Sequence, residues 1–147
     1  MVENIISQLK LEAIIVDLIQ NAIIAIESGQ NPFRSVLVAL GIASEHYELT
    51  VFDSGVKFSI DTIMRLGVQR ITTHADEGGV GIGFMSTFEI MREHDASFII
   101  KENPVSDSDF TKSITIRFDG MGRFIIKTYR DNKFPKHSKR GIEIINA

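Results

Sequence analysis

Residues 11–28 read LEAIIVDLIQNAIIAIES and contain neither glycine nor proline. Within the wider segment 4–28, isoleucine and leucine recur at helical spacing, and Gly29 stands where such a helix would end. Four polar side chains fall on one narrow stripe of this helix: Lys10, Asp17, Asn21 and Ser28. The segment therefore predicts a helix that is buried on most sides, with Asp17 and Asn21 one turn apart on its polar stripe.

The next segments carry strand patterns. Residues 35–43 and 47–52 are rich in Val, Ile, Leu and aromatic residues, and the more polar residues 44–46 lie between them. This pattern predicts a β-hairpin that ends at Asp53.

Two further helices are predicted on either side of a segment without periodicity. Ser59 can cap a short helix over residues 60–66 that Gly67 ends. Helical spacing resumes over residues 84–94. The segment between them, from residue 68 to residue 79, predicts a loop.

Three more strands are predicted in the second half of the chain, at residues 97–101, 113–118 and 124–129. Residues 119–122 read DGMG, a turn signal that predicts a hairpin between the last two of these strands. Residues 131–147 are expected to form a polar, basic tail.

Composition limits the classes of function that the chain can have. Its length of 147 residues fits one domain, and its net charge of -3 argues against a nucleic-acid partner. The chain has no cysteine, which excludes disulfides and thiolate metal sites. The apolar stretch 11–26 is too short and too polar to span a bilayer, so this piece of chain is not expected to be membrane-inserted.

A glycine-rich segment, GVGIG at residues 79–83, lies directly before the helix predicted at 84–94. Glycine lets backbone amides approach phosphate oxygens, and a helix N-terminus favours anions. The spacing differs from a P-loop, which requires Gly-Lys-Ser or Gly-Lys-Thr, and from a dinucleotide-binding turn, which follows a first strand directly. Gly79, Gly81 and Gly83 are therefore candidate phosphate-binding residues, with a structural hinge as the alternative.

Asp53 and Asn21 are the other two candidates for nucleotide contacts. A carboxylate at the end of a strand, held by the Ser54-Gly55 turn, can accept a hydrogen bond from the exocyclic amine of adenine. The amide oxygen of Asn21 is a hard ligand of the kind that magnesium prefers, and Asp17 one turn earlier could orient a water. The alternatives are a local turn at Asp53 and a polar seam along the helix.

These segments resemble a known family. DLIQNA at 17–22, DSG at 53–55 and GVGIGF at 79–84 are similar to the N, G1 and G2 boxes of the GHKL ATPase superfamily. The likeness is in particular to the catalytic ATP-binding domains of sensor histidine kinases. It covers roughly residues 11–130, so that 1–130 would form the ATP-binding domain and 131–147 the tail.

The resemblance implies a fold and a set of site residues. The fold would be a Bergerat-type α/β fold, an α+β two-layer sandwich with a mixed sheet, helices on one face and an ATP lid at about 68–78. Asn21 would bind magnesium, Asp53 would read adenine, Gly55 would let the base sit close, and Ser113 would support Asp53 through a water. The lid and its hinge would contact the phosphates through Thr72, Thr73, His74, Gly79, Gly81 and Gly83.

Departures from the family pattern leave two roles open. Asp17 stands where related ATPases carry a glutamate base and histidine kinases usually carry a second asparagine or an acidic residue, so that it could act in catalysis or only support the metal. The basic residue that many kinases carry a turn after the N-box asparagine is replaced by Ile24 and Ala25. Lys57 or Arg70 could then balance the phosphate charge.

The expected function is magnesium-dependent ATP binding and donation of the terminal phosphate to a histidine. That histidine is expected on upstream dimerisation helices that this chain lacks, so that autophosphorylation by this chain alone is not expected. A response regulator would be the further partner, and the location would be cytoplasmic, including as the cytosolic portion of a membrane-bound kinase. The alternatives are a serine/threonine kinase of the anti-sigma type and a noncatalytic nucleotide-sensing module.

Overall fold

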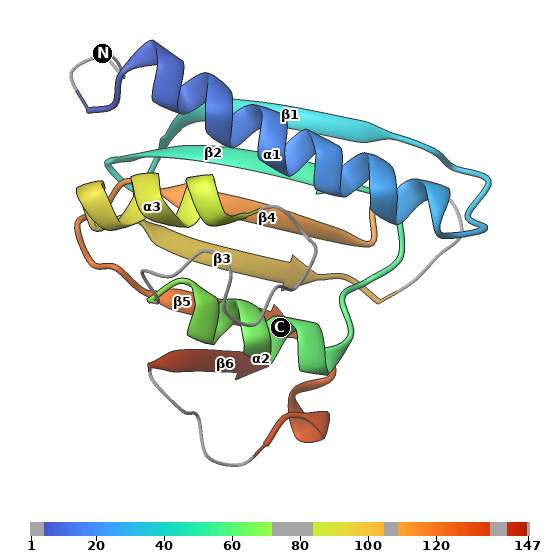
Figure 1. Ribbon diagram of the computed structural model, residues 1–147. Coiled ribbons are helices and arrows are strands. Elements are labelled where there is room, and N and C mark those ends of the chain that lie inside the picture. Colours follow the sequence, from blue (N-terminus) through green and yellow to red (C-terminus); the bar gives the residue numbers. More distant parts are fainter. Residues whose placement is uncertain (1–4, 72–83, 105–108, 136–140, 147) are drawn as a thin grey trace.

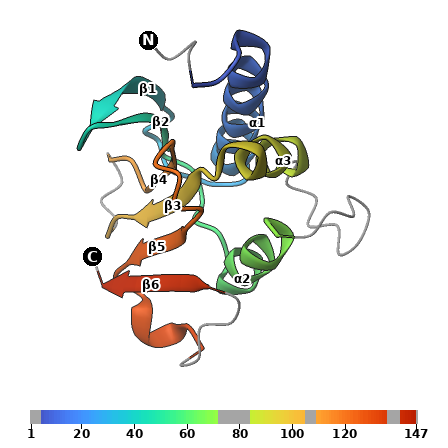
Figure 2. The same cartoon turned by 90° about the vertical axis from the view of Figure 1, so that its left-hand side faces the viewer.

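The computed structural model describes residues 5–71, 84–104, 109–135 and 141–146. A six-stranded mixed sheet forms one layer, and three helices cover one of its faces (Figures 1 and 2). The α+β two-layer sandwich predicted from the sequence is therefore confirmed. None of the helices in the described part of the chain is long and apolar enough to span a membrane.

The helical layer consists of α1 (Gln8–Glu27), α2 (Ile60–Gln69) and α3 (Met85–His94), and a short 3-10 turn, η2 (Asp131–Lys133), lies near the end of the chain. The sheet consists of β1 (Val36–Ala43), β2 (His46–Asp53), β3 (Ser97–Glu102), β4 (Lys112–Arg117), β5 (Phe124–Thr128) and β6 (Ile142–Asn146). The strand order across the sheet is β1-β2-β4-β3-β5-β6. The pairs from β1 to β3 are antiparallel, whereas β3–β5 and β5–β6 are parallel.

The first helix and the first hairpin follow the sequence pattern closely. Ser7 caps α1 by accepting a hydrogen bond from the Lys10 backbone amide, so the helix begins at Gln8 rather than at residue 4. The predicted hairpin is confirmed, because β1 pairs antiparallel with β2. Ser44 and Glu45 both have positive φ in the two-residue turn, the backbone conformation that tight hairpin turns require.

The hairpin predicted between β4 and β5 is wrong. Strand β3 lies between them and pairs with both. The glycines of the connecting turn do adopt positive φ, but the Gly122 amide donates to the Asp95 carbonyl just before β3. The Ser97 hydroxyl donates to Asp119, which fixes the connection across the start of β3. The tight turn therefore forms, whereas these longer-range contacts determine which strands pair.

The end of α2 and the C-terminal segment also differ from expectation. Helix α2 continues through Gly67 to Gln69, and a Cβ at Gly67 would lie 2.4 Å from the Ile142 side chain of β6. Glycine at this position therefore makes room for a strand and does not end the helix. Residues 142–146 pair with β5 as the edge strand β6, so this part of the expected tail belongs to the sheet.

Candidate functional site

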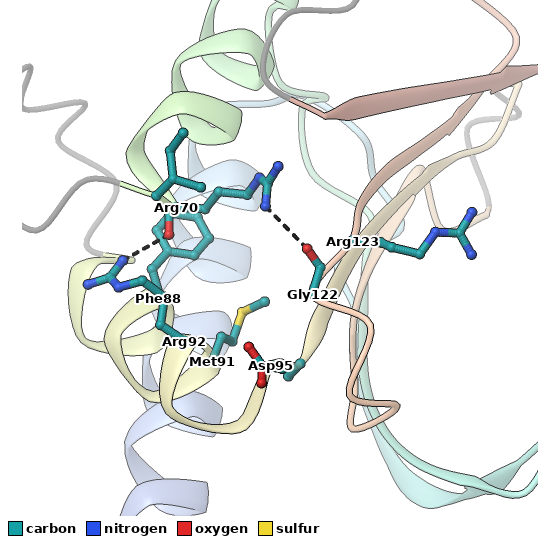
Figure 3. Close-up of a pocket in the computed structure, with 9 residues that line it drawn as sticks. Arg70, Phe88, Met91, Arg92, Asp95, Gly122 and Arg123 are labelled. Carbon is teal, nitrogen blue, oxygen red and sulfur yellow. Dashed lines mark hydrogen bonds between the residues drawn. The ribbon is translucent and has the colours of Figure 1, made fainter.

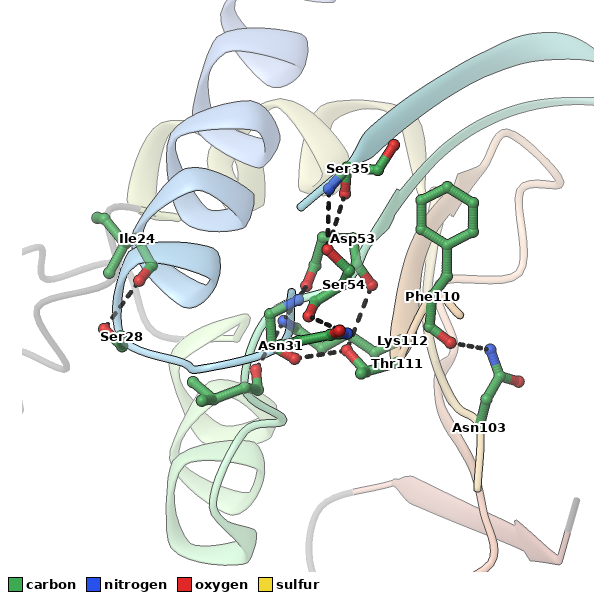
Figure 4. Close-up of polar contacts among 12 residues, drawn as sticks. Ile24, Ser28, Asn31, Ser35, Asp53, Ser54, Asn103, Phe110, Thr111 and Lys112 are labelled. Atoms are coloured by element: carbon green, nitrogen blue, oxygen red, sulfur yellow. Dashed lines mark hydrogen bonds and ion pairs between the residues drawn. The ribbon is translucent and has the colours of Figure 1, made fainter. Parts of the chain in front are cut away.

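Asp53 ends β2 on the helix-covered face of the sheet and is 1% exposed. Its Oδ1 accepts hydrogen bonds from the Gly55 backbone amide at 2.9 Å and from Lys112 Nζ at 2.8 Å (Figure 4). Both bonds fall on one oxygen, and Oδ2 makes no hydrogen bond to the residues that the structure describes. The predicted base-reading carboxylate is thus buried, fixed in orientation, and has one acceptor oxygen left over.

Lys112 is the residue that sequence reasoning missed. It is the first residue of β4, stands directly opposite Asp53 in the sheet and is 0% exposed. Its Nζ also donates to the Val56 carbonyl at 2.9 Å and lies 5.1 Å from the centre of the Phe58 ring. Burial lowers the pKa of Lys112, and the neighbouring Asp53 carboxylate opposes this shift. The ammonium group therefore ties the end of β2 to the loop that follows it.

Gly55 connects this turn to α1. A Cβ on Gly55 would lie 2.3 Å from the Ala25 backbone carbon, and the next amide, of Val56, donates to the Ala25 carbonyl at 3.0 Å. Any larger residue would collide with helix backbone, which cannot move as a side chain can. The helix packing alone therefore requires glycine here, and a contact of Gly55 with a base stays a prediction.

Asn21 lies on α1 one turn before Ala25 and is 6% exposed. Its amide nitrogen, Nδ2, is buried and has no hydrogen-bond partner among the described residues. Buried amide groups are nearly always paired, because an unpaired one costs about 1–3 kcal/mol. A buried side-chain amide without a partner is therefore the strongest local sign of a ligand site.

Two other residues of the polar stripe of α1, Asp17 and Lys10, face α3, whereas the Ser28 hydroxyl donates to the Ile24 carbonyl of its own helix. Asp17 Oδ2 accepts hydrogen bonds from Ser86 Oγ at 2.7 Å and from Thr87 Oγ1 at 2.8 Å. Lys10 forms an ion pair with Glu93 at 2.5 Å. Because Phe84 gives α3 no side-chain cap, the Asp17 carboxylate also places negative charge at the first turn of this helix. The structure thus gives Asp17 a positioning role between two helices.

Replacing Asp17 with alanine is expected to lower the free energy of unfolding by about 1–3 kcal/mol, because the fully buried Thr87 hydroxyl loses its acceptor. Urea denaturation followed by circular dichroism measures this loss. The control is Glu12→Ala on the same helix, which removes an exposed carboxylate and its hydrogen bond from Gln8 and should change stability by less than about 0.5 kcal/mol. Equal stabilities of the two variants would contradict the positioning role.

Ser113 is not brought to Asp53. It pairs with Phe52 in the sheet, whereas Lys112 pairs with Asp53, so the Ser113 side chain points to the opposite face. The hydroxyl near this turn belongs to Thr111, whose Oγ1 donates to the Gly55 carbonyl at 2.5 Å and whose amide donates to the Asp53 carbonyl. The residue opposite Asp53 is therefore Lys112, one position before Ser113, and the Thr111 hydroxyl is two positions before it.

The predicted phosphate contacts cannot be placed, since Thr72, Thr73, His74, Gly79, Gly81 and Gly83 lie outside the described residues. The two cations proposed to balance phosphate charge are directed elsewhere. Lys57 Nζ lies 5.3 Å from the Tyr129 ring, and Arg70 donates to the Gly122 carbonyl at 3.3 Å.

Two cavities lie in the described part of the chain, and one of them borders this site through Gly55 and Thr111. One, of about 350 Å³, lies between α2, α3 and the start of β5, where Arg70 reaches Gly122 and Arg123 points away (Figure 3). It is at the opposite end of β3 from the Asp53 row, about 16 Å away along the strand. The other, of about 380 Å³, lies outside the Ser54-Gly55 turn, beneath residues 29–32. Neither is lined by Asn21 or Asp53.

The described residues thus define an α+β sandwich with a buried polar site between α1 and the end of β2. In sequence, the chain is 24% identical over 108 residues to sporulation kinase E of Bacillus subtilis (strain 168). The match covers 74% of this chain and 14% of that protein, so the chain corresponds to a small part of its relative. No family model matches the chain. The similarity is distant and points to a kinase-related domain.

Proposed function

We propose that this domain binds magnesium and ATP and donates the terminal phosphate to a histidine on a separate dimerisation domain. The observation that carries the proposal is the buried amide nitrogen of Asn21, which has no hydrogen-bond partner among the described residues and lies on the helix that packs against the Asp53 turn. The distant similarity to a kinase supports the same assignment. A response regulator would then receive the phosphoryl group, and the domain would act in the cytoplasm.

Asn21 fits a magnesium site. Rotation of its amide would present Oδ1 in the place of the unpartnered Nδ2, and amide oxygen is a ligand that magnesium accepts. In the described part of the chain, no group of three or more His, Cys, Asp or Glu side chains could hold a metal. Bound magnesium would bridge phosphate oxygens and offset their charge. Asn21 would then be a protein ligand in a coordination shell completed by phosphates and water.

Asp53 fits the recognition of adenine. Lys112 and the Gly55 amide hold Oδ1, so the carboxylate cannot rotate freely, and Oδ2 is the oxygen left to accept an amine. Adenine presents such an amine, whereas guanine presents a carbonyl at the same ring position. The carboxylate would therefore favour ATP over GTP.

The remaining residues would act by positioning. Asp17 holds α3 against α1, so that the N-terminus of α3 and the Asn21 amide keep a fixed relation. Phosphoryl transfer depends mainly on such positioning and on charge stabilisation. Hydrolysis with Asp17 as a base is disfavoured, because its hydrogen bonds from Ser86 and Thr87 hold the carboxylate against α3.

Replacing Asp53 with asparagine is expected to weaken ATP binding about 10-fold or more while GTP binding changes little, a difference of about 1.4 kcal/mol between the two nucleotides. Isothermal titration with each nucleotide in magnesium measures both constants. Because the dissociation constants for ATP and GTP are measured on the same variant, any loss of folded protein cancels in the ratio of the two constants. Equal weakening of ATP and GTP would contradict the adenine-reading role.

The transfer step is tested by supplying the domain with ATP labelled at the terminal phosphate and a histidine-bearing helix pair from a two-component kinase. A label that is stable in alkali and lost in acid identifies phosphohistidine and supports the proposal. An acid-stable label on serine would identify the anti-sigma type of kinase instead. ATP binding without transfer, also when the domain is joined to its native upstream segment, would identify a nucleotide-sensing module.

A further inference from the structure

Strand β1 forms one edge of the sheet (Figures 1 and 2). Its sequence, VLVALGIA, has no charged residue and no proline, and all of its residues after Val36 are exposed. In the described part of the chain, β1 pairs with β2 alone. Monomeric proteins usually protect such an edge with charges, proline or a covering segment. An eight-residue apolar edge without these features is suited to pair with another strand.

The register shows which backbone N–H and C=O groups of β1 point away from β2. The Ser35 carbonyl accepts a hydrogen bond from the Ser54 amide, and in an antiparallel ladder the two backbone groups of a residue point to the same side. Residues of odd number therefore bond to β2, and those of even number point their N–H and C=O groups outward. The outward residues are Val36, Val38, Leu40 and Ile42.

The same outward residues carry the exposed apolar side chains on the helix-covered side of the sheet. Val38, Leu40 and Ile42 are 39%, 45% and 67% exposed. A strand that bonds to this edge would cover backbone groups and apolar side chains together. The surface therefore combines the two kinds of contact that add a strand to a sheet.

Opposite charges stand just outside the two ends of β1. Arg34 precedes the strand and Glu45 follows it. Both are exposed, and neither forms an ion pair with the residues that the structure describes. Antiparallel pairing of two identical strands brings the start of each beside the end of the other. It therefore places Arg34 of each copy near Glu45 of the other.

We propose that β1 pairs antiparallel with β1 of a second copy of this chain and forms a continuous sheet across a twofold axis. With the axis at Ala39, Val38 lies opposite Leu40 of the second copy and Val36 lies opposite Ile42. This register pairs every outward-pointing residue of one strand with one of the other, and it keeps the helices of both copies on the same face. Each Arg34 then lies opposite Ser44 and beside Glu45 of the other copy, so the charges are matched twice.

The pairing is tested by sedimentation velocity of the chain from micromolar to millimolar concentration. The unchanged chain should form a dimer, whereas Arg34→Glu alone and Glu45→Arg alone should remain monomeric, because each places like charges together twice. An equimolar mixture of the two variants should dimerise, since both contacts then join opposite charges. If the mixture dimerises and neither variant alone does so, the two β1 strands pair in the antiparallel direction.

A second pair of variants tests the strand itself. Leu40→Lys should weaken dimerisation at least 10-fold, because it places a charge opposite Val38 of the second copy. Leu9→Lys, the same change at an exposed position of α1, should leave it unaltered. A chain that stays monomeric at millimolar concentration, or a dimer that tolerates Leu40→Lys and both charge reversals, would overturn the proposal. Circular dichroism confirms that each variant is folded.

Discussion

Replacing Lys112 with methionine is expected to lower the free energy of unfolding by about 3–5 kcal/mol, the largest loss of stability expected from a single change in this chain. The substitution keeps the length and apolar stem of the side chain and removes its charge. Asp53 would then remain buried as an anion without a cation, and the Val56 carbonyl would lose its donor. Urea denaturation at neutral pH measures the loss.

Two controls test whether the loss of stability comes from breaking the buried ion pair between Lys112 and Asp53. Lys101→Met makes the same change at an exposed position of β3 and should alter stability by less than about 0.5 kcal/mol. The double variant Asp53→Leu with Lys112→Met removes both charges and should recover part of the loss, because no uncompensated charge stays buried. A single Lys112→Met variant as stable as the Lys101→Met variant would show that the ion pair does not hold this turn.

Local signals in the sequence predict the helices and the first hairpin well. Ser59 caps α2 as predicted, Ser7 caps α1 a few residues after the start predicted for that helix, and the turn at Ser44 and Glu45 lies between two strands that do pair. Each of these features depends on residues within a few positions of one another. The sequence alone contains that information.

The incorrect predictions of strand pairing and of the role of Gly67 involve partners far apart in the chain. The turn before β5 resembles a hairpin turn, but β3 is inserted beside β4 by contacts from Asp95 and Ser97. Gly67 resembles a helix stop, although its role is to accommodate Ile142 of a strand 75 residues later. No local pattern encodes these contacts, because each depends on which strands meet in the sheet.

In the candidate site, too, some residues could be predicted from local sequence and others depend on strand register. Asn21 and Asp53 could be predicted because a polar residue in an apolar run or at the end of a strand is visible in the sequence, and both are buried in the structure. Lys112 could not be predicted, because its role follows only from the register that sets it opposite Asp53. The same one-residue difference in register places Ser113 on the other face of the sheet.

Replacing Asn21 with alanine is expected to weaken binding of magnesium and ATP about 100-fold, equivalent to about 2.7 kcal/mol. It removes a ligand to a charged metal–phosphate group, the kind of contact whose loss costs most in a buried site. Titration with a fluorescent ATP analogue, with magnesium and then with a chelator, measures the effect. The loss should appear with magnesium and largely disappear without it.

The same variant separates a binding role from a structural one. The Asn21 amide nitrogen has no hydrogen-bond partner in the part of the chain that the structure describes, and alanine is the better helix former, so Asn21→Ala should raise the free energy of unfolding by about 0.5–1 kcal/mol. Gln20→Ala, on the exposed side of α1, is the matched control and should leave nucleotide binding unchanged. If Asn21 served only in packing, its removal would lower the free energy of unfolding. Lower stability with unchanged magnesium dependence would therefore reject Asn21 as a metal ligand, whereas higher stability with weaker binding is the result expected of a side chain retained for its ligand.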